Sequence, residues 1–244
     1  MWCREPPRPD DICFFTDYHL HLADRTPARR KIAWLIEPPA ICQRSYNYIR
    51  DHSTAFHYVL TYNREFVDDR KFLFCTSGGL HISPDSIGIH SKTKLISIIS
   101  SGSRGTPPGY GLRHEAISRF GTRMDVMGSG YKPIEHKEAG LVDYMFSVAI
   151  ENSAIDDYFT EKIIDCFAAG TVPIYWGTRN IGKYFDAGGI LWFNTLDELD
   201  RILCHISPDL YRGMLRSVAS NIECAKKYMV TEDYVYEQYP FLFS

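Results

Sequence analysis

Residues 146–177, FSVAIENSAIDDYFTEKIIDCFAAGTVPIYWG, contain the clearest succession of secondary-structure signals in the chain. The first five residues form a short apolar run typical of a buried strand, and residues 172–176 are β-branched and aromatic, as in a second strand. Between them, Thr160 is a suitable N-cap for a helix, and Gly170 is suited to end that helix. The stretch therefore predicts a strand, a polar loop, a helix and a strand, which together make a βαβ unit.

Polar side chains gather where the first of these strands meets the helix. The residues that follow the strand are Glu151, Asn152 and Ser153. Ligands of open α/β sheets bind at the carboxyl ends of the strands, and a helix N-terminus favours an anion. Because a lysine is mildly unfavourable at the positive end of a helix, Lys162 in the first helical turn indicates a negatively charged ligand such as a phosphate. The alternative is that Lys162 reaches solvent and pairs with Glu161 or Asp165.

The same residues resemble the signature of the glycosyltransferase family 10 fucosyltransferases. The matching pieces are Glu151-Asn152-Ser153, Tyr158-Phe159-Thr160-Glu161-Lys162 and Val172-Pro173-Ile174-Tyr175-Trp176-Gly177. They cover about thirty contiguous residues in the family's order, which is far more specific than a lone glycine-rich motif. The pair Ala149-Ile150 is a small departure, since the family commonly has an aromatic or another apolar residue before the glutamate.

The composition fits a globular protein with one large domain or two small ones. The chain has 244 residues, of which 45% are hydrophobic, so we do not expect disorder. Its 27 basic and 30 acidic residues leave a net charge of −3, which indicates no nucleic-acid surface. A nucleotide-sugar site needs only local positive charge, so this balance is compatible with one.

The cysteines and the hydropathy bear on the compartment. The chain has seven cysteines, and an odd number without a C-x-x-C pair argues against both a disulfide framework and a zinc site. Such usage favours a reducing compartment. No apolar run approaches the ~20 residues of a membrane span, and the start shows no signal-peptide core. Many eukaryotic members of the resembled family are anchored in a membrane by an apolar span. Because this sequence shows no such span, we expect a soluble, cytoplasmic protein of bacterial or viral type.

Strand and helix signals alternate along both halves of the chain, which predicts an α/β fold with two Rossmann-like halves. The resemblance implies the GT-B architecture, in which the two halves face a cleft. We assign residues 1–92 to a reduced N-terminal domain on the acceptor side and residues 93–230 to the nucleotide-sugar-binding domain. Residues 231–244 are expected to form an aromatic tail that packs on the body.

A second phosphate-binding element is predicted upstream of the signature. A strand at 94–100 leads through a loop of glycine, serine and proline into a helix that ends near residue 120. Such a loop can cradle phosphate, although its spacing matches neither a Walker motif nor G-x-G-x-x-G. The resemblance implies that an arginine opening this helix contacts the diphosphate, and Arg113 is at the matching position. Arg104, in the loop, is the alternative.

The candidate general base lies in the N-terminal half. KIAWLIEPPAI, at 31–41, resembles the family's strand that ends in a catalytic glutamate, and the matching residue is Glu37. We expect Pro38 and Pro39 to end the strand and prevent a helix, which leaves Glu37 on a loop. The alternative is that Glu37 lies on the surface without a role. Competing carboxylates and histidines are Asp17, Asp51, Glu65, His19, His21, His57 and His81.

Inverting glycosyl transfer needs a base for the acceptor hydroxyl and groups that hold the leaving diphosphate. The resemblance implies that Arg113 and Lys162 bind the diphosphate and that Glu161 binds the ribose hydroxyls. It further implies that the nucleotide-sugar site includes Glu151, Asn152, Ser153 and Tyr158. The expected reaction is transfer of fucose from GDP-fucose to a hydroxyl of a glycan or glycoconjugate.

Three alternatives to this function stay open at the sequence level. The same scaffold can use another nucleotide sugar, or the chain can be a catalytically silent carbohydrate-binding protein. Arg113, Glu161 and Lys162 argue against the catalytically silent protein, because a protein without catalytic activity does not need residues that bind a diphosphate. The missing dinucleotide fingerprint argues against an oxidoreductase. Asp156-Asp157 lacks the middle residue of a D-x-D metal clamp, so we predict no metal site, no required cofactor and at most a stimulatory divalent cation.

Overall fold

The computed structural model describes residues 6–103, 105 and 107–244. The chain forms two compact units. The first ends at Ser77 and also contains Val235–Ser244, and the second is Gly78–Tyr234. Residues 78–92, which we assigned to the N-terminal domain, pack within the second unit. Lys92 shows the reason, since its ammonium donates to the carbonyl oxygens of Val142 at 2.8 Å and Ala169 at 2.7 Å.

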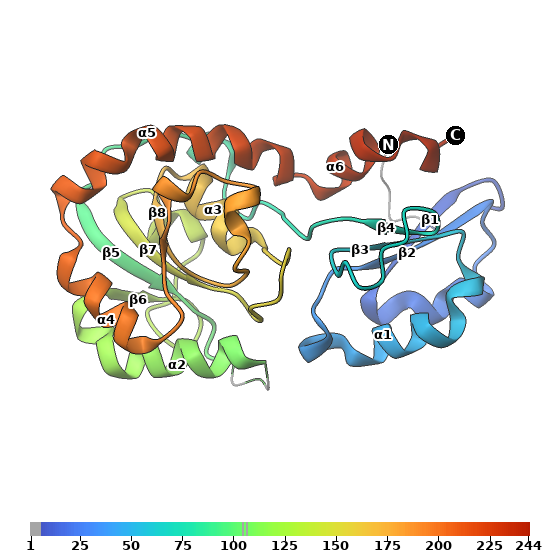
Figure 1. Cartoon of the computed structure of the whole chain (residues 1–244), viewed down its shortest axis with the longest axis horizontal. Coiled ribbons are helices and arrows are strands. Elements are labelled where there is room, and N and C mark those ends of the chain that lie inside the picture. Colours follow the sequence, from blue (N-terminus) through green and yellow to red (C-terminus); the bar gives the residue numbers. More distant parts are fainter. Residues whose placement is uncertain (1–5, 104, 106) are drawn as a thin grey trace. The chain divides into compact units, whose positions relative to one another are not determined.

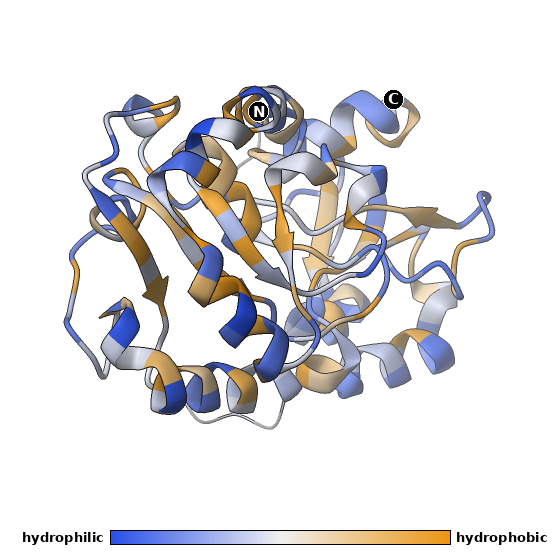
Figure 2. Ribbon diagram, turned by 60° about the vertical axis from the view of Figure 1, so that its left-hand side comes forward, coloured by the Kyte–Doolittle hydropathy of each residue, from blue (hydrophilic) through white to orange (hydrophobic). Residues whose placement is uncertain are grey.

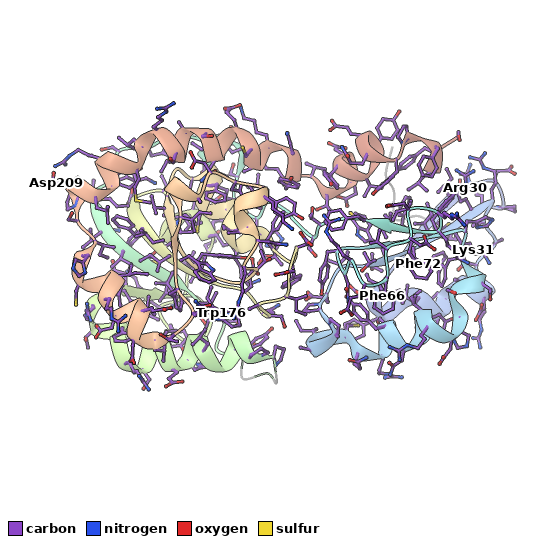
Figure 3. All side chains as sticks on the ribbon, in the orientation of Figure 1. Arg30, Lys31, Phe66, Phe72, Trp176 and Asp209 are labelled. Atoms are coloured by element: carbon purple, nitrogen blue, oxygen red, sulfur yellow. The ribbon has the colours of Figure 1, made fainter. Side chains whose placement is uncertain are left out.

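The first unit is built on a four-stranded parallel sheet in the order β1-β2-β3-β4. Its strands are β1 (Ile12–Thr16), β2 (Arg30–Leu35), β3 (Tyr58–Thr61) and β4 (Phe72–Phe74). Helix α1 (Pro39–His52) covers one face of this sheet, where its Tyr46 and Ile49 join the core (Figure 1). Beside them, the rings of Phe66 and Phe72 lie 6.5 Å apart (Figure 3).

The aromatic tail packs against the other face of the first sheet. Helix α6 (Thr231–Gln238) leads into the last residues, where the ring of Phe243 stacks on Phe14 of β1 at 5.8 Å. The hydroxyl of Tyr239 donates to the carbonyl oxygen of Phe74 at 2.6 Å. Because side chains alternate across a strand, Phe14 faces the tail while Phe15 faces α1.

Our expectation that Pro38 and Pro39 prevent a helix is wrong. Helix α1 begins at Pro39, with Pro38 as its N-cap. A proline at the first helical position loses only an N–H that has no partner within the helix, and its φ is already close to helical. Glu37 nevertheless precedes the helix and lies on the loop between β2 and α1.

The second unit is built on a five-stranded parallel sheet in the order β6-β5-β7-β8-β9. Its strands are β5 (Lys94–Ile99), β6 (Asp125–Met127), β7 (Tyr144–Ile150), β8 (Val172–Trp176) and β9 (Leu191–Trp192). Its helices are α2 (Pro108–Phe120), α3 (Glu161–Ala168), α4 (Leu196–His205) and α5 (Pro208–Ala225). Helices α2 and α4 lie on one face of the sheet and α3 on the other (Figure 1). Helix α5 contacts α3 and also adds side chains to the core cluster of α2 and α4.

Hydrophobic residues are concentrated in the strands of both sheets, while the helices alternate hydrophobic and hydrophilic residues (Figure 2). The βαβ signature adopts the predicted elements, with Thr160 as N-cap of α3 and Gly170 in the left-handed region at φ 64° after its end. Helix α4 is capped by Thr195. Thr195 and Glu198 form a reciprocal capping box, which satisfies two backbone N–H groups.

None of the helices formed by the described residues combines the length and the hydrophobicity that crossing a bilayer requires. The six cysteines in the described part of the chain are free thiols.

Candidate functional site

Glu151 is the centre of the polar loop that joins β7 to α3. Its side chain is fully buried, and burial raises the pKa of its carboxyl. The two carboxylate oxygens accept from the backbone N–H of Thr160 at 2.9 Å and from the Thr160 hydroxyl at 2.7 Å. The backbone N–H of Glu151 donates to the carbonyl of Trp176 at 2.9 Å, at the carboxyl end of β8 (Figure 3). Glu151 therefore fixes the start of α3 to the edge of the sheet.

Arg113 reaches the same loop from the second turn of α2. Its Nε donates to the carbonyl oxygen of Ile150 at 3.1 Å, and its Nη2 donates to Oδ1 of Asn152 at 2.5 Å. Arg113 is 6% exposed, and its guanidinium lies over the ring of Tyr110, with its carbon 4.7 Å from the ring centroid. These contacts use two of the five N–H donors of an arginine. They orient a fork-shaped cation at the carboxyl end of β7.

Lys162 places a second cation at the start of α3. Its Nζ donates to the Thr160 hydroxyl at 3.0 Å and lies 3.3 Å from Glu161 Oε1 and 3.6 Å from Glu151 Oε2. Burial lowers the pKa of Lys162, but the two carboxylates outweigh burial and raise it. The lysine thus pairs with Glu161, as the alternative interpretation predicted, and with the buried Glu151 rather than with Asp165.

Glu161 lies between two lysines. Its Oε1 is 3.5 Å from Nζ of Lys137 as well as 3.3 Å from Nζ of Lys162. Burial opposes its ionisation, yet the two ammonium groups hold the pKa of Glu161 at about 2. Lys137 also contacts Asp165 at 2.9 Å, and Asp165 accepts from the backbone N–H of His81 at 2.7 Å. The carboxylate of Glu161 is therefore ionised and fixed in place at neutral pH.

The remaining predicted residues of this loop lie in the same layer. Ser153 and Tyr158 are both buried. Asp157 has a left-handed backbone, and its carboxylate accepts from Nδ2 of Asn180 at 3.0 Å and from the Tyr184 hydroxyl. Asp156 is exposed. Arg104, the rival of Arg113, lies outside the described residues.

Glu37 lies in the first unit, at the carboxyl end of β2, and is half-buried. The rival carboxylate Asp17 follows β1 and is 8% exposed, whereas Asp51 and Glu65 are exposed. Three of the rival histidines, His19, His21 and His57, are exposed in the first unit, and His81 is exposed in the second. The structure thus brings Asp17 to the Glu37 loop and leaves the other candidates on the surface.

Two site residues were missed by the sequence interpretation. Lys137 neutralises Glu161 and Asp165 from a polar segment with no periodic pattern. Tyr110 lies against Arg113 from the first turn of α2, three residues earlier in the chain. Residues three apart on a helix are neighbours on its surface. The spacing of Tyr110 and Arg113 could therefore have indicated their contact once the start of the helix was known.

Three comparisons connect this geometry to known proteins. Residues 89–204 match the family model described as glycosyltransferase family 10 (fucosyltransferase), C-terminal. An alpha-(1,3)-fucosyltransferase from Helicobacter pylori is 27% identical over 150 residues, which are 53% of this chain and 31% of that protein. A 3-galactosyl-N-acetylglucosaminide 4-alpha-L-fucosyltransferase from Bos taurus is 25% identical over 165 residues, or 64% of this chain and 42% of that protein.

The fold agrees with these relatives. A crystal structure of an alpha1,3-fucosyltransferase with GDP-fucose superimposes with a TM-score of 0.54 at 15% identity, over 94% of this chain and 96% of that one. The chain matches less than half the length of either curated relative. Its two parallel α/β units have the GT-B fold of glycosyltransferases, and residues 89–204 are similar to the C-terminal part of glycosyltransferase family 10.

Proposed function

We propose that this protein is an inverting glycosyltransferase that transfers fucose from GDP-fucose to a hydroxyl of a glycan. The observation that carries the proposal is the meeting of Arg113 and Lys162 at the carboxyl end of β7, in the segment that matches the family. Both cations contact the loop after β7, since Arg113 donates to Asn152 and Nζ of Lys162 lies 3.6 Å from Glu151, which supports a shared role. We assign nucleotide-sugar binding to the second unit and acceptor binding to the first.

The cations suit a leaving diphosphate. Arg113 can present its N–H groups to two phosphate oxygens, and Lys162 supplies a point charge beside the N-terminus of α3. Negative charge builds on the diphosphate as the bond to the sugar breaks, and preoriented cations stabilise that charge. Glu161 is kept ionised by Lys137 and Lys162, so it can accept hydrogen bonds from the two ribose hydroxyls. Asn152 and Tyr158 would add neutral hydrogen bonds.

We assign the general base to Glu37. In the proposed reaction its carboxylate takes the proton of the acceptor hydroxyl while that oxygen attacks the anomeric carbon. The bond from the anomeric carbon to the diphosphate breaks, and its electron pair leaves with GDP. Attack opposite the leaving group inverts the anomeric configuration.

The reaction is proposed not to need a divalent cation strictly. Arg113 and Lys162 can neutralise the diphosphate, which is the task that a metal ion performs in other transferases. Asp157 is one of the two acidic residues considered for a metal clamp. Its carboxylate accepts hydrogen bonds from Asn180 and Tyr184. Activity that survives EDTA would support this assignment, and a loss that Mn²⁺ or Mg²⁺ restores would overturn it.

The first test of the donor is the thermal stability of the second unit with GDP, GDP-fucose, UDP, CMP and ADP. A ligand that binds only the folded protein raises its stability by mass action. We expect stabilisation by GDP and GDP-fucose and its loss in Arg113→Ala. Arg119→Ala is the matched control, because Arg119 lies on the same helix but pairs with Glu115 on the surface.

Each other outcome selects a different function. Stabilisation by UDP alone would keep the scaffold and reject fucose transfer. No stabilisation by any nucleotide would favour a silent carbohydrate-binding protein. If GDP-fucose binds, NMR of the product formed from galactosyl-N-acetylglucosamine disaccharides tests inversion, since a β-linked donor must then give an α-linked product.

A further inference from the structure

The two-residue segment Ile36-Glu37 is held by side chains at every one of its backbone polar groups. The N–H groups of Ile36 and Glu37 both donate to the carboxylate of Asp17, at 3.1 Å and 3.3 Å for the shortest contact of each. The carbonyl oxygen of Ile36 accepts from the Ser77 hydroxyl at 2.8 Å. The carbonyl oxygen of Glu37 accepts from the Tyr46 hydroxyl at 3.0 Å. Three separate segments of the first unit therefore converge on this loop.

Such an arrangement is more than a loop requires. The ladder of β2 ends at Leu35, which pairs with Thr61, and backbone groups beyond a strand end can be satisfied by water. Here they are satisfied instead by Asp17, Ser77 and Tyr46, which are 8%, 5% and 1% exposed. Burying three polar side chains to hold two residues fixes the direction in which the Glu37 side chain leaves the loop.

Asp17 differs from the other two holding residues in its backbone. Its φ is +32°, in the left-handed region that L-residues other than glycine, asparagine and aspartate rarely adopt. This conformation follows directly after Thr16, the last residue of β1, and it coincides with the side chain's contact with the β2 loop. A left-handed residue beside a candidate base is the kind of local strain that accompanies functional sites.

We propose that Asp17 is a positioning residue for the transfer reaction, whose carboxylate fixes the backbone of Ile36-Glu37 and thereby aims the Glu37 side chain. This inference rests on the proposed function, in which Glu37 is the base. Asp17 acts through Glu37 and does not itself take the acceptor proton. Ser77 and Tyr46 hold the opposite side of the same two peptide groups.

The charged surroundings of Asp17 supply an additional readout. The charge of Glu37 on the β2 loop acts on Asp17. Asp17 in turn raises the pKa of Tyr46 on α1, of Tyr62 after β3 and of the adjacent Tyr18. Burial and the charge of Glu37 raise the pKa of Asp17 to about 6, although the two backbone N–H groups oppose this increase. The charge of the holding carboxylate therefore changes near pH 6, so the acid side of the rate profile should depend on Asp17.

The test compares Asp17→Ala and Asp17→Asn with Glu37→Gln in one assay. The assay is single-turnover release of GDP from GDP-fucose, with galactosyl-N-acetylglucosamine disaccharides as acceptors. We expect Asp17→Ala to lower the rate by about 10- to 100-fold, since small misplacement of a reacting group has effects of this size. The KM for GDP-fucose should not change. Asp24→Ala is the matched control, because exposed Asp24 lies in the same short helix, Asp17–Arg25.

Asp17→Asn separates positioning from proton transfer. Asparagine keeps an acceptor oxygen and tolerates the left-handed region, so the rate should stay within about five-fold of wild type, the cost of a weakened charge-assisted bond. The acid side of its rate profile should lose the change near pH 6. If Asp17→Asn is as inactive as Glu37→Gln, Asp17 is itself the base and the inference is overturned.

Ser77→Ala keeps the inference testable if Asp17→Ala does not fold. It removes the bond to the Ile36 carbonyl and should lower the turnover rate without changing the GDP affinity. Wild-type protein that binds no GDP, or that releases none from GDP-fucose, would refute the proposed function and the inference with it. An active wild type, an inactive Glu37→Gln and an unimpaired Asp17→Ala would refute the inference alone.

Discussion

The carboxyl edges of the two parallel sheets share an architecture but hold their polar groups differently. At the first edge, Asp17 bonds to the backbone of the loop that carries Glu37. At the second edge, side chains bond mainly to side chains, as in the contacts of Lys162 with Glu151 and Glu161. The first arrangement fixes the course of the chain, whereas the second balances charge within a network.

Under the proposed function, the difference would let one architecture support two chemical tasks. Strand-loop-helix connections place both sets of residues at the carboxyl ends of parallel strands, where α/β sheets bind their ligands. The acidic first edge is suited to accept a proton, and the second edge, with Arg113 and Lys162, is suited to hold a diphosphate. The fold thus supplies the location, and the side chains at each edge decide the chemistry.

The largest expected effect comes from removing the carboxylate of the first edge. Glu37→Gln should lower the single-turnover rate by about 10²- to 10⁴-fold, the usual contribution of a general base. GDP affinity should be unchanged, because the residues proposed to bind the nucleotide lie in the second unit. Glu65→Gln is the control, since Glu65 is an exposed carboxylate of the same unit. Equal rates for the two variants would remove the acidic edge from the mechanism.

The pH dependence of stability gives the next effect. The folded pKa of Asp17 is about 6, above its ordinary value of 3.8, so the folded protein binds more protons than the unfolded chain between these values. The contribution of Asp17 to the free energy of unfolding should therefore fall as pH rises from about 4 to about 6. Asp17→Asn removes this fall, and its stability relative to wild type should increase by up to about 3 kcal/mol across that range.

Hydrogen exchange of the β2 amides, measured from pH 4 to pH 7, follows this unit specifically. If the protection of the β2 amides changes with pH in the same way in Asp17→Asn and in wild type, the first edge is not pH-sensitive. A difference that grows only above about pH 6 would assign the titration to another group.

A smaller effect is expected for a cation of the second edge. Lys162→Ala should weaken GDP binding by about 10- to 100-fold, the value of one charge-assisted hydrogen bond to phosphate. Calorimetric titration with GDP measures this change directly. Lys226→Ala is the control, because Lys226 pairs with Glu223 on an exposed surface. Undiminished GDP affinity in Lys162→Ala would mean that the lysine serves only to balance Glu151 and Glu161.

The smallest effect concerns the hydroxyl inside the charged network. Thr160→Ala removes the N-cap of α3 and the hydroxyl that donates to Glu151, which should lower the stability of the second unit by about 1 kcal/mol. Thr160→Ser keeps the hydroxyl and should restore most of this stability. Exchange of the α3 amides reports the change. Unchanged exchange of the α3 amides in Thr160→Ala would show that the Thr160 cap does not stabilise this helix.

Local sequence signals were sufficient where one segment determines its own structure. The apolar run of β7, the Thr160 cap, Gly170 and the β-branched residues of β8 are each recognisable within a few neighbours, and the structure confirms them. The same local reasoning was wrong at Pro39, because a proline both breaks a helix interior and favours a helix start. Deciding between these roles required the packing of α1 against the first sheet.

The sequence by itself determined the βαβ order, the family signature and the cation at the start of α3, because periodicity, caps and motifs are encoded in neighbouring residues. Only the tertiary structure decided that Asn152 meets Arg113, that Lys137 sets the charge state of Glu161, and that Asp17 holds the Glu37 loop. These contacts join segments far apart in the chain. Their geometry follows from how strands and helices pack, which no local pattern specifies.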